Sequence, residues 1–139
     1  HRPRALSGAG VALAKTAAGE DALAALAIGP IGQLLEPTGT LSFQDAYDAF
    51  ALQVRAGAES GAGLIAIETM TDLAEARAAL LAAKENSSLP VLCTMTFEGN
   101  GRTFTGCSVA AMALTLTGLG ADAIGINCSL GPREMPALV

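Results

Sequence analysis

Three short apolar segments of the chain carry side chains that can do chemistry at or near their ends: a carboxylate, two hydroxyls, an amide and a thiol. These residues are Glu68, Thr94, Thr96, Asn127 and Cys128. A carboxylate can bind a cationic group or move a proton, and a thiolate is a nucleophile or a metal ligand. If the three segments are parallel strands, their carboxyl ends share one edge of the sheet, where α/β proteins bind ligands. We therefore expect these side chains to meet at one rim.

Glu68 and Cys128 are the two candidate site residues, and each has a structural interpretation beside the functional one. A glutamate directly after an apolar strand is often only the solvated start of a loop. Free cysteines are usually small buried hydrophobes. We expect that role for Cys93, inside an apolar segment, and for Cys107, at a loop-to-helix junction. Cys128 differs because it ends a strand between two polar residues, where a thiolate can face a site, although packing remains the commoner role.

Several other kinds of site are excluded by the residues present. The one histidine, His1, is terminal, which argues against a Cys–His catalytic pair. The glycine-rich stretches match neither a dinucleotide fingerprint nor a phosphate-binding loop. No Cys-x-x-Cys pair occurs, which excludes a four-cysteine structural zinc site within the chain.

The elements that must position these residues follow from the glycines and prolines that divide the chain. Strands are expected at 63–67, 89–97 and 123–128, and the run 21–28 is a less certain strand because Ala and Leu also suit a helix. Helices are expected at 9–18, from 42 to about 61, at 73–85 and at 109–119.

The starts of three helices carry capping residues. Ser42 with Asp45, and Asp72 with Glu75, have the spacing of a capping box, in which the first side chain accepts an early N–H and the second reaches back. Ser108 is a plausible N-cap for the fourth helix.

The strands near 64, 91 and 123 lie about 30 residues apart, which is the length of a βαβ unit. Strands that are apolar on both faces are typical of a parallel sheet covered by helices. Two architectures stay open on this basis: a doubly wound open sheet, or part of a (β/α)₈ barrel. A complete barrel needs about 250 residues, and a new helix is expected at 132–135, just before the sequence stops. We therefore expect a single, incomplete domain over 1–139 with about four parallel strands.

Composition narrows the class of protein. The 139 residues are 51% hydrophobic with a net charge of −5, which excludes a disordered chain and argues against a nucleic-acid partner. Charged residues or glycines interrupt every apolar run, so no membrane span is expected. Three widely spaced cysteines do not form a disulfide framework, and no signal peptide is apparent, so a reducing cytoplasm is the expected location.

Four segments together resemble a known family: 67–72 (IETMTD), 90–97 (PVLCTMTF), 101–106 (GRTFTG) and 120–132 (GADAIGINCSLGP). They resemble the homocysteine-binding domain of homocysteine S-methyltransferases, and within that family the homocysteine half of cobalamin-dependent methionine synthases. The Gly-x-Asn-Cys motif ending at Cys128 is the most specific part. The likeness spans nearly the whole chain, in order and with few gaps.

The resemblance implies a (β/α)₈ TIM barrel that binds a catalytic zinc through three thiolates. Cys128 matches the first thiolate, and the adjacent cysteine pair that supplies the other two is not in this sequence. Cys93 and Cys107 do not match that pair. Glu68 matches the glutamate that holds the amino group of the substrate, homocysteine. Zinc bound by three thiolates keeps one position open for the substrate sulfur and deprotonates it, which yields a nucleophile for a methyl group.

The expected function is therefore zinc-dependent methyl transfer to homocysteine, which gives methionine. The methyl donor in the wider family is methylcobalamin held by another domain, a sulfonium compound or a betaine. With one of three thiolates, the chain alone is expected to be inactive, and its two free sheet edges invite self-association. Two alternatives stay open: another α/β-barrel enzyme that uses Glu68 and Cys128 without zinc, and a non-catalytic binding or assembly module.

Overall fold

The structure is a computed structural model that describes residues 2–138, so His1 lies outside the described residues. Helices and strands alternate along the chain. The elements are α1 (Arg2–Ala18), β1 (Ala25–Ile28), α2 (Phe43–Glu59), β2 (Leu64–Met70), α3 (Leu73–Asn86), β3 (Val91–Met95), α4 (Val109–Gly118), β4 (Ala123–Ile126) and a final 3₁₀ helix, η1 (Met135–Ala137). Among the described residues, no helix is long and apolar enough to cross a membrane.

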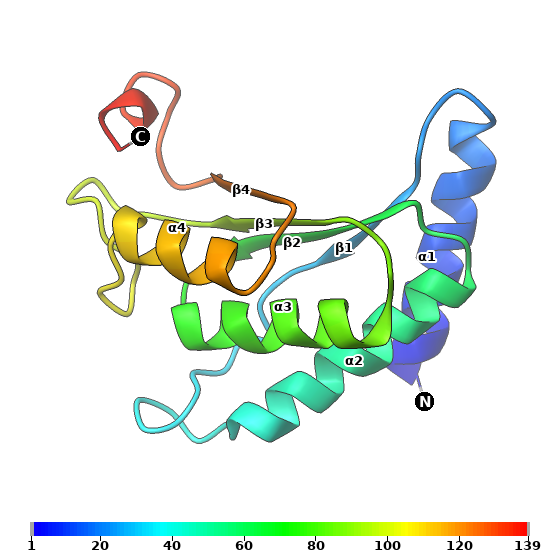
Figure 1. Cartoon of the computed structure of the whole chain (residues 1–139), viewed down its shortest axis with the longest axis horizontal. Coiled ribbons are helices and arrows are strands. Elements are labelled where there is room, and N and C mark those ends of the chain that lie inside the picture. The colour runs from blue at the N-terminus through cyan, green and yellow to red at the C-terminus, as the bar shows by residue number, and fades with distance from the viewer. Residues whose placement is uncertain (1, 139) are drawn as a thin grey trace.

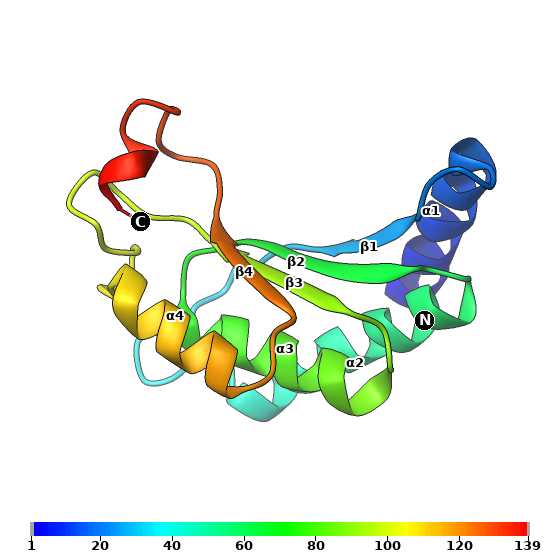
Figure 2. The same ribbon diagram turned by 45° about the horizontal axis from the view of Figure 1, so that its top comes forward.

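The four strands form one parallel sheet in the order β1-β2-β3-β4. Helices α2, α3 and α4 lie on one side of this sheet, and α1 stands beside its β1 edge (Figures 1 and 2). A doubly wound sheet would reverse its strand order and carry helices on both faces. Sequential order with helices on one side is instead the arrangement of a (β/α)₈ barrel. The structure is therefore part of a TIM barrel, as expected.

The hydrophobic core lies between the sheet and these helices. The strands contribute large apolar side chains, and α3 contributes almost only alanines, which let the helix approach the sheet closely. The fully buried strand residues are Ile28, Ile65, Ile67, Met70, Val91, Cys93 and Met95. The opposite face carries smaller or more polar residues, among them Ala27, Ala66 and Thr94, which are exposed or half-buried. Within the described chain, the sheet is therefore covered on one face, where the sequence pattern suggested two.

The observed boundaries differ from the expected ones in several places. Helix α1 begins at Arg2, well before residue 9, and only the last four residues of the run 21–28 form a strand. Strand β2 continues to Met70, so that Glu68 lies inside the strand and not after it. The helix expected at 132–135 is the short 3₁₀ helix η1. These errors occur where propensity is weak and pairing with a neighbouring strand decides the conformation.

The predicted N-caps are confirmed at all three helices. Ser42 accepts the N–H of Asp45, Asp72 accepts that of Ala74, and Ser108 accepts that of Ala111.

The second partner of each capping box behaves differently from the prediction. The Asp45 carboxylate accepts the Ser42 hydroxyl at 2.7 Å, not the expected backbone N–H. Glu75 does not reach back to Asp72. Its carboxylate accepts the N–H of Ile31, 44 positions earlier, at 2.6 Å. The prediction for Glu75 was wrong because a donor from a distant loop competes with the local one.

Candidate functional site

Strands β2 and β4 end in unusual backbone conformations. The pairing of β2 with β3 shifts register between Ile67 and Met70, and Thr69 within that irregularity has φ of 62°. Cys128 and Ser129, after β4, both have φ of 59°. A positive φ is uncommon outside glycine and is a clear outlier for a β-branched residue such as threonine. Strain of this kind persists only where surrounding contacts enforce it.

The side chain of Asn127 supplies such contacts at Thr69. Its Oδ1 accepts the backbone N–H of Thr69 at 3.1 Å, and its Nδ2 donates to the Thr69 hydroxyl at 2.8 Å. The Thr94 hydroxyl donates to the same Oδ1 at 2.9 Å, and the Thr96 hydroxyl donates to the Asn127 carbonyl at 3.0 Å. The side-chain amide of Asn127, just after β4, therefore links the carboxyl ends of β2 and β3 to that of β4 by hydrogen bonds.

The sulfur of Cys128 lies against this network and is open to solvent. Asn127 Nδ2 lies 3.4 Å from Sγ, and the Thr69 hydroxyl lies 3.8 Å from it. Cys128 itself is exposed. Polar side chains that lie against a sulfur in this way hold it in one orientation. The arrangement presents a thiol that a metal ion or an electrophile can reach.

Glu68 lies next to this cluster along the chain. The alternation of burial along β2 places Glu68 on the same face of the sheet as Leu64 and Ala66, away from the helices, and its side chain is exposed. The structure therefore brings Thr94, Thr96, Asn127 and Cys128 into one hydrogen-bonded cluster, as the sequence predicted. It places Glu68 beside Thr69 at the same rim.

Thr69 is the member of the cluster to which sequence reasoning gave no role. The residue stood inside the IETMTD segment, but a positive φ at a threonine leaves no mark on the sequence. The only available signal was its place at the end of an apolar run, three residues before the helix cap Asp72.

The other two cysteines are placed for packing. Cys93 is fully buried between β3 and the helices, and burial raises the pKa of its thiol to about 12. Cys107 is half-buried, and its Sγ donates to the carbonyl of Ser108 at 3.3 Å. Burial also raises the pKa of the Cys107 thiol. Both thiols are thus held neutral, which suits packing and not metal binding.

A metal site needs several donors, and the rim supplies one thiol. Among residues 2–138, no group of three or more histidines, cysteines, aspartates or glutamates lies close enough to hold a metal ion. The described residues therefore do not complete a three-thiolate zinc site, and Cys128 is a single donor within them.

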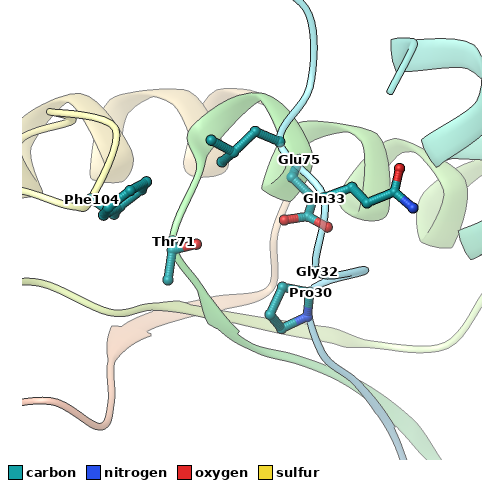
Figure 3. A pocket seen from close by; sticks show the side chains of 7 residues that line it. Pro30, Gly32, Gln33, Thr71, Glu75 and Phe104 are labelled. Atoms are coloured by element: carbon teal, nitrogen blue, oxygen red, sulfur yellow. The ribbon is translucent and has the colours of Figure 1, made fainter. Parts of the chain in front are cut away.

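A pocket of about 240 Å³ opens nearby among the loops that follow the strands. Its lining residues come from the loop after β1, the β2–α3 junction and the loop after β3: Pro30, Gly32, Gln33, Leu34, Thr71, Glu75 and Phe104. The carboxylate of Glu75 lies between Thr71 and the Pro30–Gly32 loop (Figure 3). Glu75 is 3% exposed, and this burial raises the pKa of its carboxyl group.

In sequence, the chain matches a protein family and individual proteins of known name. Residues 1–139 match the family described as "Homocysteine S-methyltransferase". The chain is 30% identical to a methionine synthase of Mycobacterium leprae over 113 residues, which are 78% of this chain and 9% of that protein. It is 35% identical to a methionine synthase of Mycobacterium tuberculosis over 97 residues, which are 66% of this chain and 8% of that protein. The chain thus spans about a tenth of these relatives.

The fold also matches a solved structure. The apo crystal structure of the homocysteine methyltransferase MmuM from Escherichia coli superimposes with a TM-score of 0.82 at 23% identity. The match covers 99% of this chain and 53% of that one. This likeness shows the fold, and it agrees with an arrangement that is part of a barrel.

Proposed function

Because the chain belongs to the homocysteine S-methyltransferase family, we propose that it forms part of an enzyme that transfers a methyl group to the sulfur of homocysteine, giving methionine. The observation that carries this proposal is the rim cluster. An exposed thiol, held by Asn127 and Thr69, stands at the carboxyl end of a barrel sheet, on a strand next but one to the strand that carries Glu68.

Cys128 is the residue we assign to zinc. The other two thiolates would come from residues outside this sequence, since Cys93 is buried in the core and Cys107 packs at the start of α4. Bound zinc supplies a positive charge that keeps the homocysteine sulfur deprotonated near neutral pH. Asn127 and Thr69 act as positioning residues, because their side chains bond to each other and both lie against the sulfur of Cys128, which orients it.

Glu68 is the residue we assign to the substrate amino group. Its carboxylate is exposed on the open face of the sheet, where an ammonium group can reach it. An ion pair there would orient the amino acid so that its side chain runs toward the rim and Cys128. Orientation of this kind is a large part of catalysis between two bound partners.

The proposal also includes the methyl donor and the cellular compartment of the reaction. The likeness to methionine synthases favours methylcobalamin presented by another domain. Three free cysteines suit a reducing compartment, so we place the protein in the cytoplasm.

The assignment of Cys128 is tested by titrating the whole enzyme, which includes the residues that supply the other two thiolates, with Co²⁺, which takes the place of zinc and absorbs light when thiolate-bound. We expect a thiolate-to-cobalt absorption band, and we expect Cys128→Ser to weaken both this band and the cobalt affinity. Cys107→Ser is the matched control, because it removes a half-buried thiol, and it should leave the band intact. A band and a cobalt affinity that Cys128→Ser leaves unchanged, or that Cys107→Ser weakens as much, would show that Cys128 is not the ligand.

The assignment of Glu68 uses the same cobalt-loaded enzyme. Addition of L-homocysteine should intensify the band, since the substrate sulfur would add to the thiolates of the protein. Glu68→Gln should weaken the apparent homocysteine affinity at least tenfold, which corresponds to about 1.4 kcal/mol, and leave the cobalt affinity unchanged. Glu98→Gln, in an exposed loop, is the charge-matched control. Equal homocysteine affinity in the two variants would refute the assignment.

A further inference from the structure

The pocket of about 240 Å³ among the loops after β1, β2 and β3 contains a buried carboxyl group whose two oxygens differ in their contacts. Glu75 is 3% exposed, and its Oε1 accepts the backbone N–H of Ile31 at 2.6 Å. Among residues 2–138, no fully enclosed side-chain oxygen or nitrogen lacks a hydrogen-bond partner. The Oε2 atom has no such partner in that part of the chain, so it is not enclosed by protein and faces the pocket that Glu75 lines. The pocket therefore offers one free acceptor on a buried carboxyl group.

No positive charge of the pocket lining compensates this carboxyl group. The other lining residues come from the three loops and carry no charge: Pro30, Gly32, Gln33, Leu34, Thr71 and Phe104. The charged group that acts on Glu75 is the carboxylate of Asp72, the N-cap of the same helix, and it adds to the effect of burial in raising the pKa of Glu75. A buried carboxylate is ordinarily paired with a cation. The pocket therefore attracts positive charge.

The walls of the pocket suit a short hydrocarbon body. Pro30, Leu34 and Phe104 supply apolar surface, and Phe104 is 68% exposed although it is a large aromatic residue. Thr71 lies between the ring of Phe104 and the carboxylate of Glu75 (Figure 3). The face of an aromatic ring attracts cations. Pockets for drug-sized ligands have volumes of about 300–1,000 Å³, so the ligand of this pocket is smaller.

We propose that this pocket binds a small organic ammonium ion, whose N–H groups donate to Glu75 Oε2 and to the hydroxyl of Thr71 and whose carbon chain packs on Leu34 and Phe104. Hydrogen bonds between an ionised donor and a carboxylate are stronger than those between neutral groups. None of the lining residues belongs to the cluster of Thr69, Asn127 and Cys128. The proposal is therefore independent of the methyl transfer proposed above.

A pair of probes with the same carbon chain tests the proposed ligand class. The whole enzyme is titrated with n-butylammonium chloride at constant ionic strength, and saturation-transfer NMR gives the dissociation constant. The neutral probe 1-butanol is titrated in the same way. We expect saturable binding of n-butylammonium and an affinity for 1-butanol that is at least tenfold weaker, because 1-butanol has no charge to pair with Glu75. Absence of saturable n-butylammonium binding, or equal affinity for the two probes, would overturn the proposal.

Two variants locate the binding site. Glu75→Gln keeps an acceptor for the Ile31 N–H and removes the charge, and it should weaken n-butylammonium binding at least tenfold. Glu98→Gln, in the exposed loop after β3, is its matched control and should bind as the parent does. Phe104→Ala should weaken binding severalfold through loss of the apolar wall, whereas Leu114→Ala, which removes an exposed side chain from α4, should not. Far-ultraviolet circular dichroism confirms that each variant is folded.

The pH dependence of binding distinguishes a direct ion pair with Glu75 from an indirect effect of the substitution. The ammonium ion pairs with the ionised carboxylate, so its affinity for the parent should rise with pH as Glu75 loses its proton. The probe keeps its charge over this range, because alkylammonium groups such as that of lysine titrate at about pH 10. Glu75→Gln should show no such rise. Equal affinity in Glu75→Gln and Glu98→Gln, or the same pH dependence in both, would refute the assignment of this pocket.

Discussion

Two buried or half-buried side chains, Asn127 and Glu75, connect parts of the chain that are distant in sequence. Asn127 binds Thr69, 58 positions earlier, and Glu75 binds Ile31, 44 positions earlier. Both interactions act at the carboxyl end of the sheet. Asn127 holds the strand ends that carry the candidate site, and Glu75 holds the loop after β1. A buried polar group that lacks its hydrogen-bond partner lowers the free energy of unfolding. Both interactions therefore hold the loops and strand ends at this rim in place.

The buried carboxyl group of Glu75 makes stability depend on pH. Burial raises the pKa of this group in the folded chain above its ordinary value of 4.5. The folded state therefore takes up a proton at higher pH than the unfolded state does. The stabilisation from this uptake is complete below the ordinary pKa and is lost as the pH rises through the folded-state pKa.

We expect Glu75→Gln to remove this dependence, because glutamine can still accept the Ile31 N–H without burying a charge. The variant should be more stable than the parent chain at pH 7, and the difference should shrink as the pH falls toward 4.5. Urea unfolding at a series of pH values measures this. Glu98→Gln, at an exposed position, should show no such trend, and a pH-independent difference for Glu75→Gln would contradict the explanation.

At the scale of elements, small residues determine how closely the helices approach the sheet. Gly57 in α2 faces Leu26 of β1, and a Cβ built at Gly57 would lie 2.6 Å from a methyl group of Leu26. Leu26 is 3% exposed and has little room to move. The glycine is therefore required by packing, although glycine is a poor helix former.

Gly57→Ala separates these two effects. Alanine gains up to about 1 kcal/mol of helix propensity, but overpacking a core costs about 1–3 kcal/mol, so we expect a net loss of stability. Gly118→Ala is the control, because nothing lies within 4 Å of the added Cβ in α4, and it should not lower stability. Urea midpoints of the two variants decide the matter, and a Gly57→Ala chain as stable as the parent would show that α2 can shift away from β1.

At the scale of the whole molecule, the described chain is a barrel segment with one covered face, and its rim holds one accessible thiol. The proposed chemistry needs three thiolates around one metal ion, and the segment has no cluster of that kind within residues 2–138.

The chain by itself should therefore not make methionine. Incubation with zinc, L-homocysteine and methylcobalamin, a sulfonium donor or a betaine should give no labelled methionine by mass spectrometry when the donor methyl group carries an isotope. Cys128→Ser serves as the blank. Methionine formation by the parent chain that is lost in Cys128→Ser would mean that a single thiolate suffices and would change the proposed mechanism.

The sequence by itself determined the local features of this protein. The three N-caps, the helices that follow them and the apolar strands depend on residues within a few positions of one another, where propensity and periodicity act. Residues such as Asn127 and Cys128 stood out because strand ends in α/β proteins converge. The family was apparent from contiguous motifs, and the family match over residues 1–139 confirms it.

Only the tertiary structure decided which partners these residues meet. The positive φ of Thr69, the continuation of β2 past Glu68 and the bond from Glu75 to Ile31 all depend on segments tens of residues apart. The choice between a doubly wound sheet and a barrel segment also needed the strand order, since both have the same succession of strands and helices. Local propensities are too weak to specify such contacts, because the free energy that selects among them arises when distant groups are buried together.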